Sequence, residues 1–359
     1  MFFEESKTML VHYSPLLNSP LSSPVLVEPI HIARFDISSS LNSRTRHPVC
    51  SLIFQKPKLY VAATQCLSSD ETQITEETSR EAGGREDEDE DFQVVSAIKS
   101  SYNDIVIIDT AGSRLLLLDQ THNIHSIFYK GRNDHWTNSY WDEFAALPPI
   151  VPPGPIAIYG LGGGTAAHLL LDSYPHLEIE GWEIDDVLVD KSREFLGLAD
   201  LETANGEGGV LKVCVGDALL PSEEMAVDGK YAGIIVDLFK EGKVLEEMPD
   251  VELWGRVKRR LRPGGRVMVN CGGAENVMAD AGSRGGGGGD AWVVNLTVQA
   301  MWEAFKGELC WKKMPRNEGE NYMAMTGGMP ELEKWEASVP EKLRAKVWGW
   351  MPFPNVPSQ

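Results

Sequence analysis

The sequence has 359 residues, of which 42% are hydrophobic, with 33 basic and 53 acidic residues and a formal net charge of −20. That length is enough for one large domain or two modest ones, each with a core. The acidic balance disfavours nucleic acid as a partner, because such binding depends on Lys and Arg contacts to phosphates. No apolar run approaches the roughly 20 residues of a membrane span. The five cysteines are scattered without CxxC spacing, so neither a disulfide framework nor a metal site is expected.

The N-terminal quarter is unlike the rest of the chain. We expect residues 1–69 to be a disordered segment, and the Ser-rich, acid-poor composition of 29–69 is typical of an organellar transit peptide. This composition favours localisation in the chloroplast. The cytoplasm is the alternative, because Glu4 and Glu5 stand where such peptides avoid acid. Residues 70–91 carry 11 acidic and 2 basic side chains, which predicts an acidic linker or, alternatively, a docking segment.

Residues 92–148 predict a small antiparallel β unit followed by a connecting helix. Apolar runs at Ile105–Asp109 and Leu115–Asp119 flank a tight turn and indicate two strands, and Ser126–Tyr129 indicates a third. The helical pattern of Tyr140–Leu147 then stops at two prolines.

From 149 to 328 short apolar runs alternate with helical patterns, which predicts a parallel sheet with helices on both faces. The last two runs have no helix between them and predict a terminal antiparallel hairpin. The fold class expected is therefore α/β, a Rossmann-like sheet of seven strands preceded by the small β unit. The seven strands are predicted at 156–159, 177–183, 211–215, 233–237, 266–270, 309–313 and 322–326.

Two further segments complete the chain. Residues 282–290 include five consecutive glycines and predict a flexible surface loop within the Rossmann-like region. Residues 329–359 predict a C-terminal helix over Glu331–Val347 and an extended tail. In this segment Trp335 and Trp348 are the expected packing anchors.

The residues that indicate chemistry follow the strands of the parallel sheet, where ligands bind in open α/β folds. Gly160, Gly162 and Gly164 form a glycine-rich turn between the first strand and its helix, which allows close approach of the backbone to a ligand. Glu183 ends the second strand, 23 residues after Gly160, where a carboxylate accepts hydrogen bonds from both hydroxyls of a ribose.

Two aspartates follow the next strands. Asp217 is placed to meet an adenine amino group or a neighbouring loop, and Asp237 ends the fourth strand. Each acid has a structural alternative, which is to cap the helix that follows it. Together with the glycine turn, however, the ordered set predicts a ligand that contains adenosine. Thr165 occupies the place where a dinucleotide site requires a small residue, which favours S-adenosylmethionine (AdoMet) over a dinucleotide.

With these motifs, residues 95–328 resemble the plant-type, spermidine synthase-like branch of AdoMet-dependent transferases. The aminopropyltransferases of this branch have a GGGDGG loop, in which Gly163 replaces the Asp here. Their DSSDP-like run keeps only its first Asp, as Asp237. The resemblance implies that Asp237 is the catalytic base for an amine and that Tyr140 binds substrate. It also places Asn123 where the family has a glutamine.

Three functional hypotheses remain from the sequence. The lost acids weaken the case for a doubly charged amine substrate, so we expect methyl transfer from AdoMet to an unidentified small-molecule or protein acceptor. The first alternative is aminopropyl transfer from decarboxylated AdoMet to a polyamine, and the second is a non-catalytic member of the family. The resemblance also implies a homodimer, and neither nucleic acid nor a membrane is expected as a partner.

Overall fold

The computed structural model describes residues 92–121, 123–132, 134–220, 227–273, 295–318 and 321–353. The predicted N-terminal segment 1–69, the acidic linker 70–91 and the glycine-rich loop 282–290 lie outside the described residues. Among the helices that are described, none combines the length and the apolar character needed to cross a bilayer.

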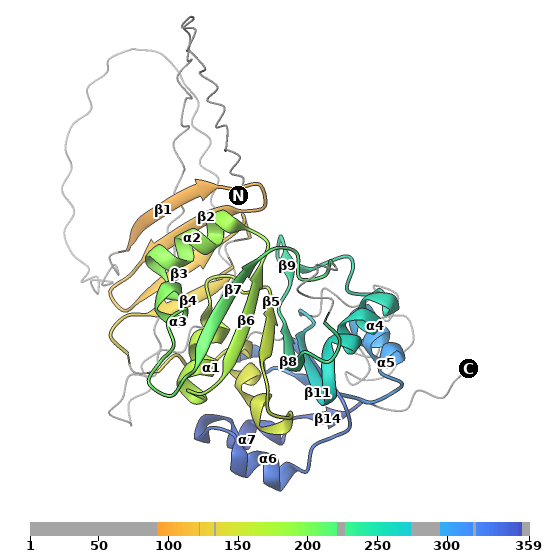
Figure 1. Ribbon diagram of the computed structural model, residues 1–359. Helices are drawn as coiled ribbons and strands as arrows, with labels where there is room; N and C mark the ends of the chain where they lie inside the picture. The colour runs from red at the N-terminus through yellow and green to blue at the C-terminus, as the bar shows by residue number, and fades with distance from the viewer. Residues whose placement is uncertain are drawn as a thin grey trace, which may run out of the picture. The chain divides into compact units, whose positions relative to one another are not determined.

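A four-stranded antiparallel sheet comes first, in the order β1-β2-β3-β4 (Figure 1). It confirms the predicted small β unit and adds one strand. That strand, β1, is only partly buried, so its apolar pattern is weak and gave no sequence signal. The strands are β1 (Gln93–Lys99), β2 (Asp104–Asp109), β3 (Ser113–Leu117) and β4 (Ser126–Tyr129).

The second sheet has eight strands in the order β14-β12-β13-β11-β8-β5-β6-β7. The five strands from β11 to the edge strand β7 are parallel, and the hairpin β12–β13 joins antiparallel to β11. This confirms the Rossmann-like sheet with a terminal hairpin; the C-terminal tail supplies an eighth strand. The strands are β5 (Ile156–Tyr159), β6 (Glu178–Glu183), β7 (Val210–Val215), β8 (Tyr231–Val236), β11 (Leu261–Asn270), β12 (Leu309–Lys313), β13 (Tyr322–Thr326) and β14 (Met351–Pro352).

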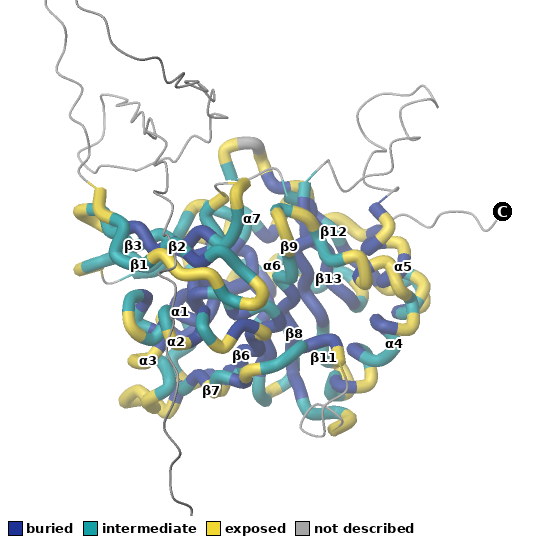
Figure 2. The backbone as a smooth tube through the Cα atoms, turned by 90° about the horizontal axis from the view of Figure 1, so that it is seen from above, coloured by how far each residue is buried: buried dark blue, intermediate teal, exposed yellow. Residues whose placement is uncertain are grey.

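Each face of this sheet buries its own core. Along β5 the side chains alternate, with Ile156 and Ile158 in one cluster and Ala157 and Tyr159 in the other, as the period of a strand requires. Strand β8 is buried over its whole length (Figure 2). The helices that cover the sheet are α1 (Thr165–Ser173), α2 (Asp186–Phe195), α3 (Leu198–Leu201), α4 (Val251–Arg260) and α5 (Leu296–Ala304).

A third apolar cluster holds the small sheet against the Rossmann-like region. Ile105, Ile107 and Leu116 of the small sheet pack on Leu188 and Leu196 of the α2 segment, and all five are buried. The small sheet therefore lies beside the turn from β6 to α2, where the sequence places Glu183.

The C-terminal segment differs from the single helix predicted over Glu331–Val347. It forms α6 (Leu332–Ser338), the short 3-10 helix η7 (Glu341–Leu343) and α7 (Arg344–Val347). Pro340 accounts for the break, because it has no backbone N–H and disfavours helical geometry in the residue before it.

The tryptophan anchors were predicted only in part. Trp335 is buried and donates a hydrogen bond from Nε1 to the Ala146 carbonyl at 2.8 Å, whereas Trp348 is 48% exposed. Trp350 takes the anchoring role instead and is 2% exposed. The helix predicted at 140–147 forms, but as a 3-10 helix, η1 (Tyr140–Ala146). A second 3-10 helix, η2 (Pro148–Ile150), follows it.

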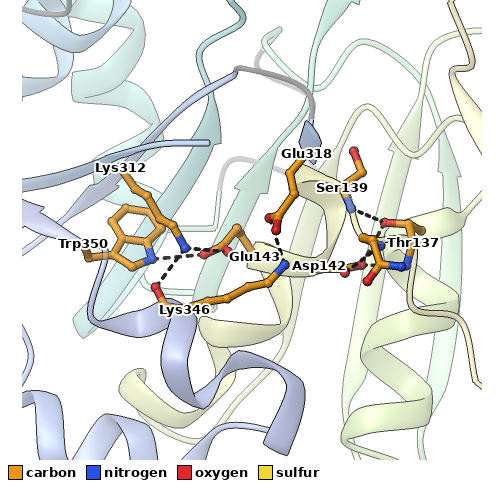
Figure 3. Close-up of polar contacts among 9 residues, drawn as sticks. Thr137, Ser139, Asp142, Glu143, Lys312, Glu318, Lys346 and Trp350 are labelled. Atoms are coloured by element: carbon orange, nitrogen blue, oxygen red, sulfur yellow. Dashed lines mark hydrogen bonds and ion pairs between the residues drawn. The ribbon is translucent and has the colours of Figure 1, made fainter. Parts of the chain in front are cut away.

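A buried ion pair connects η1 to β12, and hydrogen bonds connect this pair to the C-terminal segment (Figure 3). The Glu143 carboxylate is fully buried and accepts hydrogen bonds from Lys312 Nζ at 2.7 Å and Trp350 Nε1 at 3.2 Å. Lys312 Nζ also donates to the Lys346 carbonyl at 2.9 Å. Burial raises the pKa of Glu143, and the Lys312 ammonium acts in the opposite direction. The C-terminal segment thus supports the helix that carries Tyr140.

We expect the substitution Lys312→Met to lower the free energy of unfolding by about 3–5 kcal/mol, because it leaves the buried Glu143 carboxylate without its counter-charge. Urea denaturation at pH 7 measures the change. The matched control is Lys334→Met, which removes an exposed pair with Glu331 and should cost less than about 1 kcal/mol. Equal losses in the two variants would contradict a structural role for the buried pair.

Candidate functional site

A cavity of about 1930 Å³ lies at the carboxyl ends of the parallel strands. The strand register explains why the predicted residues meet there. Tyr159 of β5 is paired with Trp182 of β6 and Val236 of β8, and Val236 is paired with Val269 of β11. The residues that follow these four therefore form one row at the edge of the sheet. They are Gly160, Glu183, Asp237 and Asn270, and all four line the cavity.

Most of the predicted site residues line this cavity. They are Gly160, Gly162, Glu183, Asp217, Asp237 and Tyr140. The exception is Gly164, which is the N-cap of α1 with φ +88°. A Cβ at Gly164 would lie 2.7 Å from Leu198 Cδ1, so this glycine serves packing between α1 and α3.

The glycine turn has no backbone donor to spare for a phosphate. The N–H groups of residues 160–164 all have partners within the protein. Two donate to the Trp182 carbonyl, one to Glu183 Oε2, one to Ser126 Oγ and one to the Leu161 carbonyl. A pyrophosphate-binding turn keeps such groups free for the ligand. The turn therefore fits a nucleoside ligand without phosphates better than a dinucleotide.

Glu183 is held by backbone donors at the edge of the cavity. The residue is 8% exposed, and its carboxylate accepts the Gly162 N–H on Oε2 at 2.9 Å and the Asp185 N–H on Oε1 at 3.2 Å. Burial raises the pKa of Glu183, and the two backbone donors act against that shift. The backbone N–H of Ile184 acts in the same direction, so the carboxylate is held by the backbone of its own turn where the residue lines the cavity.

Asp217 makes a contact within its own turn and also lines the cavity. Its Oδ1 accepts the Leu219 N–H at 2.8 Å, within the turn that follows β7. The residue also lines the cavity, at the end of β7 after Gly216. The carboxylate is therefore held by its own turn while it borders the cavity on the same side as Glu183.

Asp237 lies at the centre of a hydrogen-bond network. Its Oδ2 accepts hydrogen bonds from Tyr140 OH at 3.1 Å and Trp141 Nε1 at 3.2 Å, and its Oδ1 accepts one from Asn270 Nδ2 at 2.9 Å. Burial raises the pKa of Asp237 to about 6, although these three hydrogen bonds lower it. Burial and the neighbouring Asp237 charge raise the pKa of Tyr140 well above its usual value. The structure thus brings together the predicted Tyr140 and Asp237.

Sequence reasoning missed three residues of this network. Trp141 was visible only as the neighbour of Tyr140, and Asn270 ends β11 in the way that the named acids end their strands. The strand-end rule would have found Asn270 if amides had been considered with carboxylates. Asn321 had no such signal, and its Nδ2 donates to Asn270 Oδ1 at 2.8 Å. Asn123, the predicted counterpart of the family glutamine, also borders the cavity.

Comparison with known proteins finds relatives that are named as transferases. No family model matches the sequence. A probable polyamine aminopropyl transferase of Bifidobacterium longum is 26% identical over 184 residues, which cover 51% of this chain and 37% of that protein. Putrescine N-methyltransferase 1 of Nicotiana tabacum is 30% identical over 179 residues, 48% of this chain and 44% of that protein. The chain thus spans less than half the length of each of these relatives.

A solved structure, that of a probable spermidine synthase from Corynebacterium glutamicum, is 18% identical with a TM-score of 0.48; the match covers 74% of this chain and 98% of that one. The sheet order described above is that of a Rossmann-like α/β fold with a terminal antiparallel hairpin. Over about half of its length, the chain is similar in sequence to proteins named for polyamine aminopropyl transfer and for putrescine N-methylation.

We expect the substitution Gly160→Ala to lower the free energy of unfolding by at least about 1–2 kcal/mol. Gly160 has φ +85°, and a Cβ there would lie 2.3 Å from the Asp237 carbonyl oxygen, so the backbone must move. Thermal and urea unfolding measure the change. The control is Gly255→Ala in α4, where a Cβ meets open space and should stabilise the helix by up to about 1 kcal/mol. Equal stability of the two variants would show that the turn tolerates a side chain.

Proposed function

We propose that this protein is an AdoMet-dependent transferase that transfers a methyl group to an amine-bearing acceptor, either a small molecule or a protein. The observation that carries the proposal is the Asp237 carboxylate. It is buried in the row of strand ends, is oriented by three side-chain donors and has a pKa raised by burial to about 6. Relatives named for aminopropyl transfer and putrescine methylation support a transferase that acts on polyamine-like compounds.

The geometry of the turn and of the acids supports an AdoMet-type ligand. Glu183 would bind the two ribose hydroxyls, and Asp217 would border the adenine. The glycine turn at residues 160–164 supplies close backbone contact without phosphate donors. When bound, AdoMet supplies a carbon attached to a sulfonium, which is an activated leaving group. The protein then has to align the acceptor and manage its proton.

Asp237 would accept the proton of the acceptor. An amine acceptor must lose a proton when its nitrogen becomes a nucleophile, and a carboxylate beside it can accept this proton and later release it to solvent. Trp141 and Tyr140 hold Oδ2, and Asn270 holds Oδ1, so the carboxylate keeps one orientation during the exchange. The aromatic pair also borders the cavity and would form the wall on which the acceptor packs.

Aminopropyl transfer is the second candidate, favoured by the similarity to the Bifidobacterium longum protein. The two reactions differ in the donor, because aminopropyl transfer uses decarboxylated AdoMet. Calorimetric titration of the full chain with each donor separates them. A preference for AdoMet together with labelled methyl transfer to putrescine or other amines supports the proposal. A preference for the decarboxylated donor would replace it with aminopropyl transfer, and binding without turnover would indicate a non-catalytic protein.

The substitution Asp237→Asn should lower the transfer rate by about 10²–10⁴-fold while the donor affinity changes less than about threefold. The amide keeps the shape of the side chain but cannot accept a proton. Single-turnover transfer and calorimetric titration on the same preparation measure the two quantities. A parallel fall in affinity and rate would show that Asp237 serves only to bind the donor.

The pH dependence follows from the same carboxylate. Asp237 must be deprotonated to act as a base, so the rate should fall about tenfold per pH unit below pH 6 and become level above it. The stability of the fold depends on pH in the opposite direction to the rate. The raised pKa favours the neutral carboxyl in the folded protein, so its stabilising contribution is lost as pH rises through 6. A rate profile that is level from pH 5 to pH 8 would contradict the role of Asp237.

A further inference from the structure

The cavity has an apolar rim at one end that the proposed chemistry leaves unused. Ten large hydrophobic side chains are exposed within the described residues, and three of them line the cavity. These are Tyr102, Ile184 and Leu220, which are 53%, 38% and 61% exposed. Exposed apolar groups gathered at the edge of a cavity are typical of a surface that a ligand covers.

All three side chains belong to the end of the cavity that contains the proposed nucleoside acids. Ile184 directly follows Glu183, and Leu220 comes three residues after Asp217. Tyr102 comes from a different part of the fold, the turn between β1 and β2 of the small sheet. The position of Tyr102 on the rim therefore depends on the contacts that hold the small sheet to the Rossmann-like region.

The attachment is a buried carboxylate. Asp185 is fully buried, and its Oδ2 accepts hydrogen bonds from Ser100 Oγ at 2.5 Å and Asn103 Nδ2 at 2.7 Å. The other oxygen, Oδ1, accepts the Leu188 N–H and caps α2. The Asp185 N–H in turn donates to Glu183 Oε1. Asp185 thus connects Glu183, the proposed ribose-binding acid, to the β1–β2 turn.

The turn itself is well held, so its aromatic residue has a defined place. The Ser100 N–H donates to the Asn103 carbonyl at 2.9 Å, and Ser100 Oγ accepts the N–H groups of Tyr102 at 3.0 Å and Asn103 at 2.9 Å. The backbone of Tyr102 is therefore fixed from both sides while its ring remains uncovered. An exposed aromatic ring on a rigid turn can bind a flat partner with little loss of conformational entropy.

We infer that Tyr102 is a nucleoside-binding residue, whose ring covers the adenosine part of the ligand at the rim formed with Ile184. This inference rests on the proposed function and adds a contribution from the small sheet to donor binding. Adenine has two apolar faces and is recognised by stacking on aromatic side chains. The small sheet then has a role in binding besides its packing on α2.

The substitution Tyr102→Ala tests the inference by calorimetric titration of the full chain. The ligands are AdoMet and 5′-methylthioadenosine, which keeps the nucleoside but lacks the amino-acid tail. We expect both affinities to fall by the same factor, about tenfold, which corresponds to about 1.4 kcal/mol. Tyr102→Phe keeps the ring and should remain within twofold of the unmodified protein.

The control is Phe92→Ala, another exposed aromatic residue of the small-sheet region, which does not border the cavity. Its affinities should be unchanged, and the unfolding midpoints of all three variants should match the unmodified protein. If that protein binds AdoMet but Tyr102→Ala leaves both affinities within twofold, or weakens only AdoMet, the inference is overturned and the proposed function stands. If the unmodified protein binds neither ligand, the proposed function fails and the inference fails with it.

Discussion

The site depends on the parallel register of four neighbouring strands. Hydrogen-bonded pairing sets Tyr159, Trp182, Val236 and Val269 opposite one another across β5, β6, β8 and β11. The next residue of each strand is then forced into a single row at the carboxyl edge. The strands are buried on both faces, so a slip of one residue would turn each apolar set away from its core. Core packing therefore holds the polar row in place.

The polar row is held close together because glycine occupies one of its positions. At Gly160 the chain turns within van der Waals distance of the Asp237 backbone, and the turn that follows donates to Glu183. The proposed donor-binding and proton-accepting carboxylates are thus coupled through one short loop. Burial raises the pKa of both acids, and the surrounding donors limit the shift, which keeps Asp237 available as a base near neutral pH.

Two segments outside the Rossmann-like region complete the cavity, and each is anchored by a buried carboxylate. Glu143 binds Lys312 and Trp350 and so holds the helix that presents Tyr140 to Asp237. Asp185 binds the β1–β2 turn of the small sheet and holds it beside Glu183. Buried carboxylates that lack partners are costly, so each anchor specifies one arrangement of the segment that it binds.

The sequence alone determined the alternation of strands and helices and the terminal hairpin, and most of the site residues that it predicts line the cavity. These features are local: apolar runs of strand length report burial, and a glycine turn or an acid directly after such a run is visible without knowledge of its neighbours. Pro340 is an equally local signal, and it marks the break in the single helix that the C-terminal pattern predicts. The helical pattern does not distinguish Trp348 from Trp350, although only Trp350 is buried.

Only the tertiary structure decided which distant side chains meet. The contact of Asp237 with Trp141 and Asn270, the pair of Glu143 with Lys312, and the bond from Asn103 to Asp185 join residues that are 33 to 169 positions apart. Such pairings leave no periodic pattern in the sequence, because they depend on the packing of whole sheets and helices against each other. The strand ends mark where chemistry can occur, and the packing of the other segments decides what surrounds it.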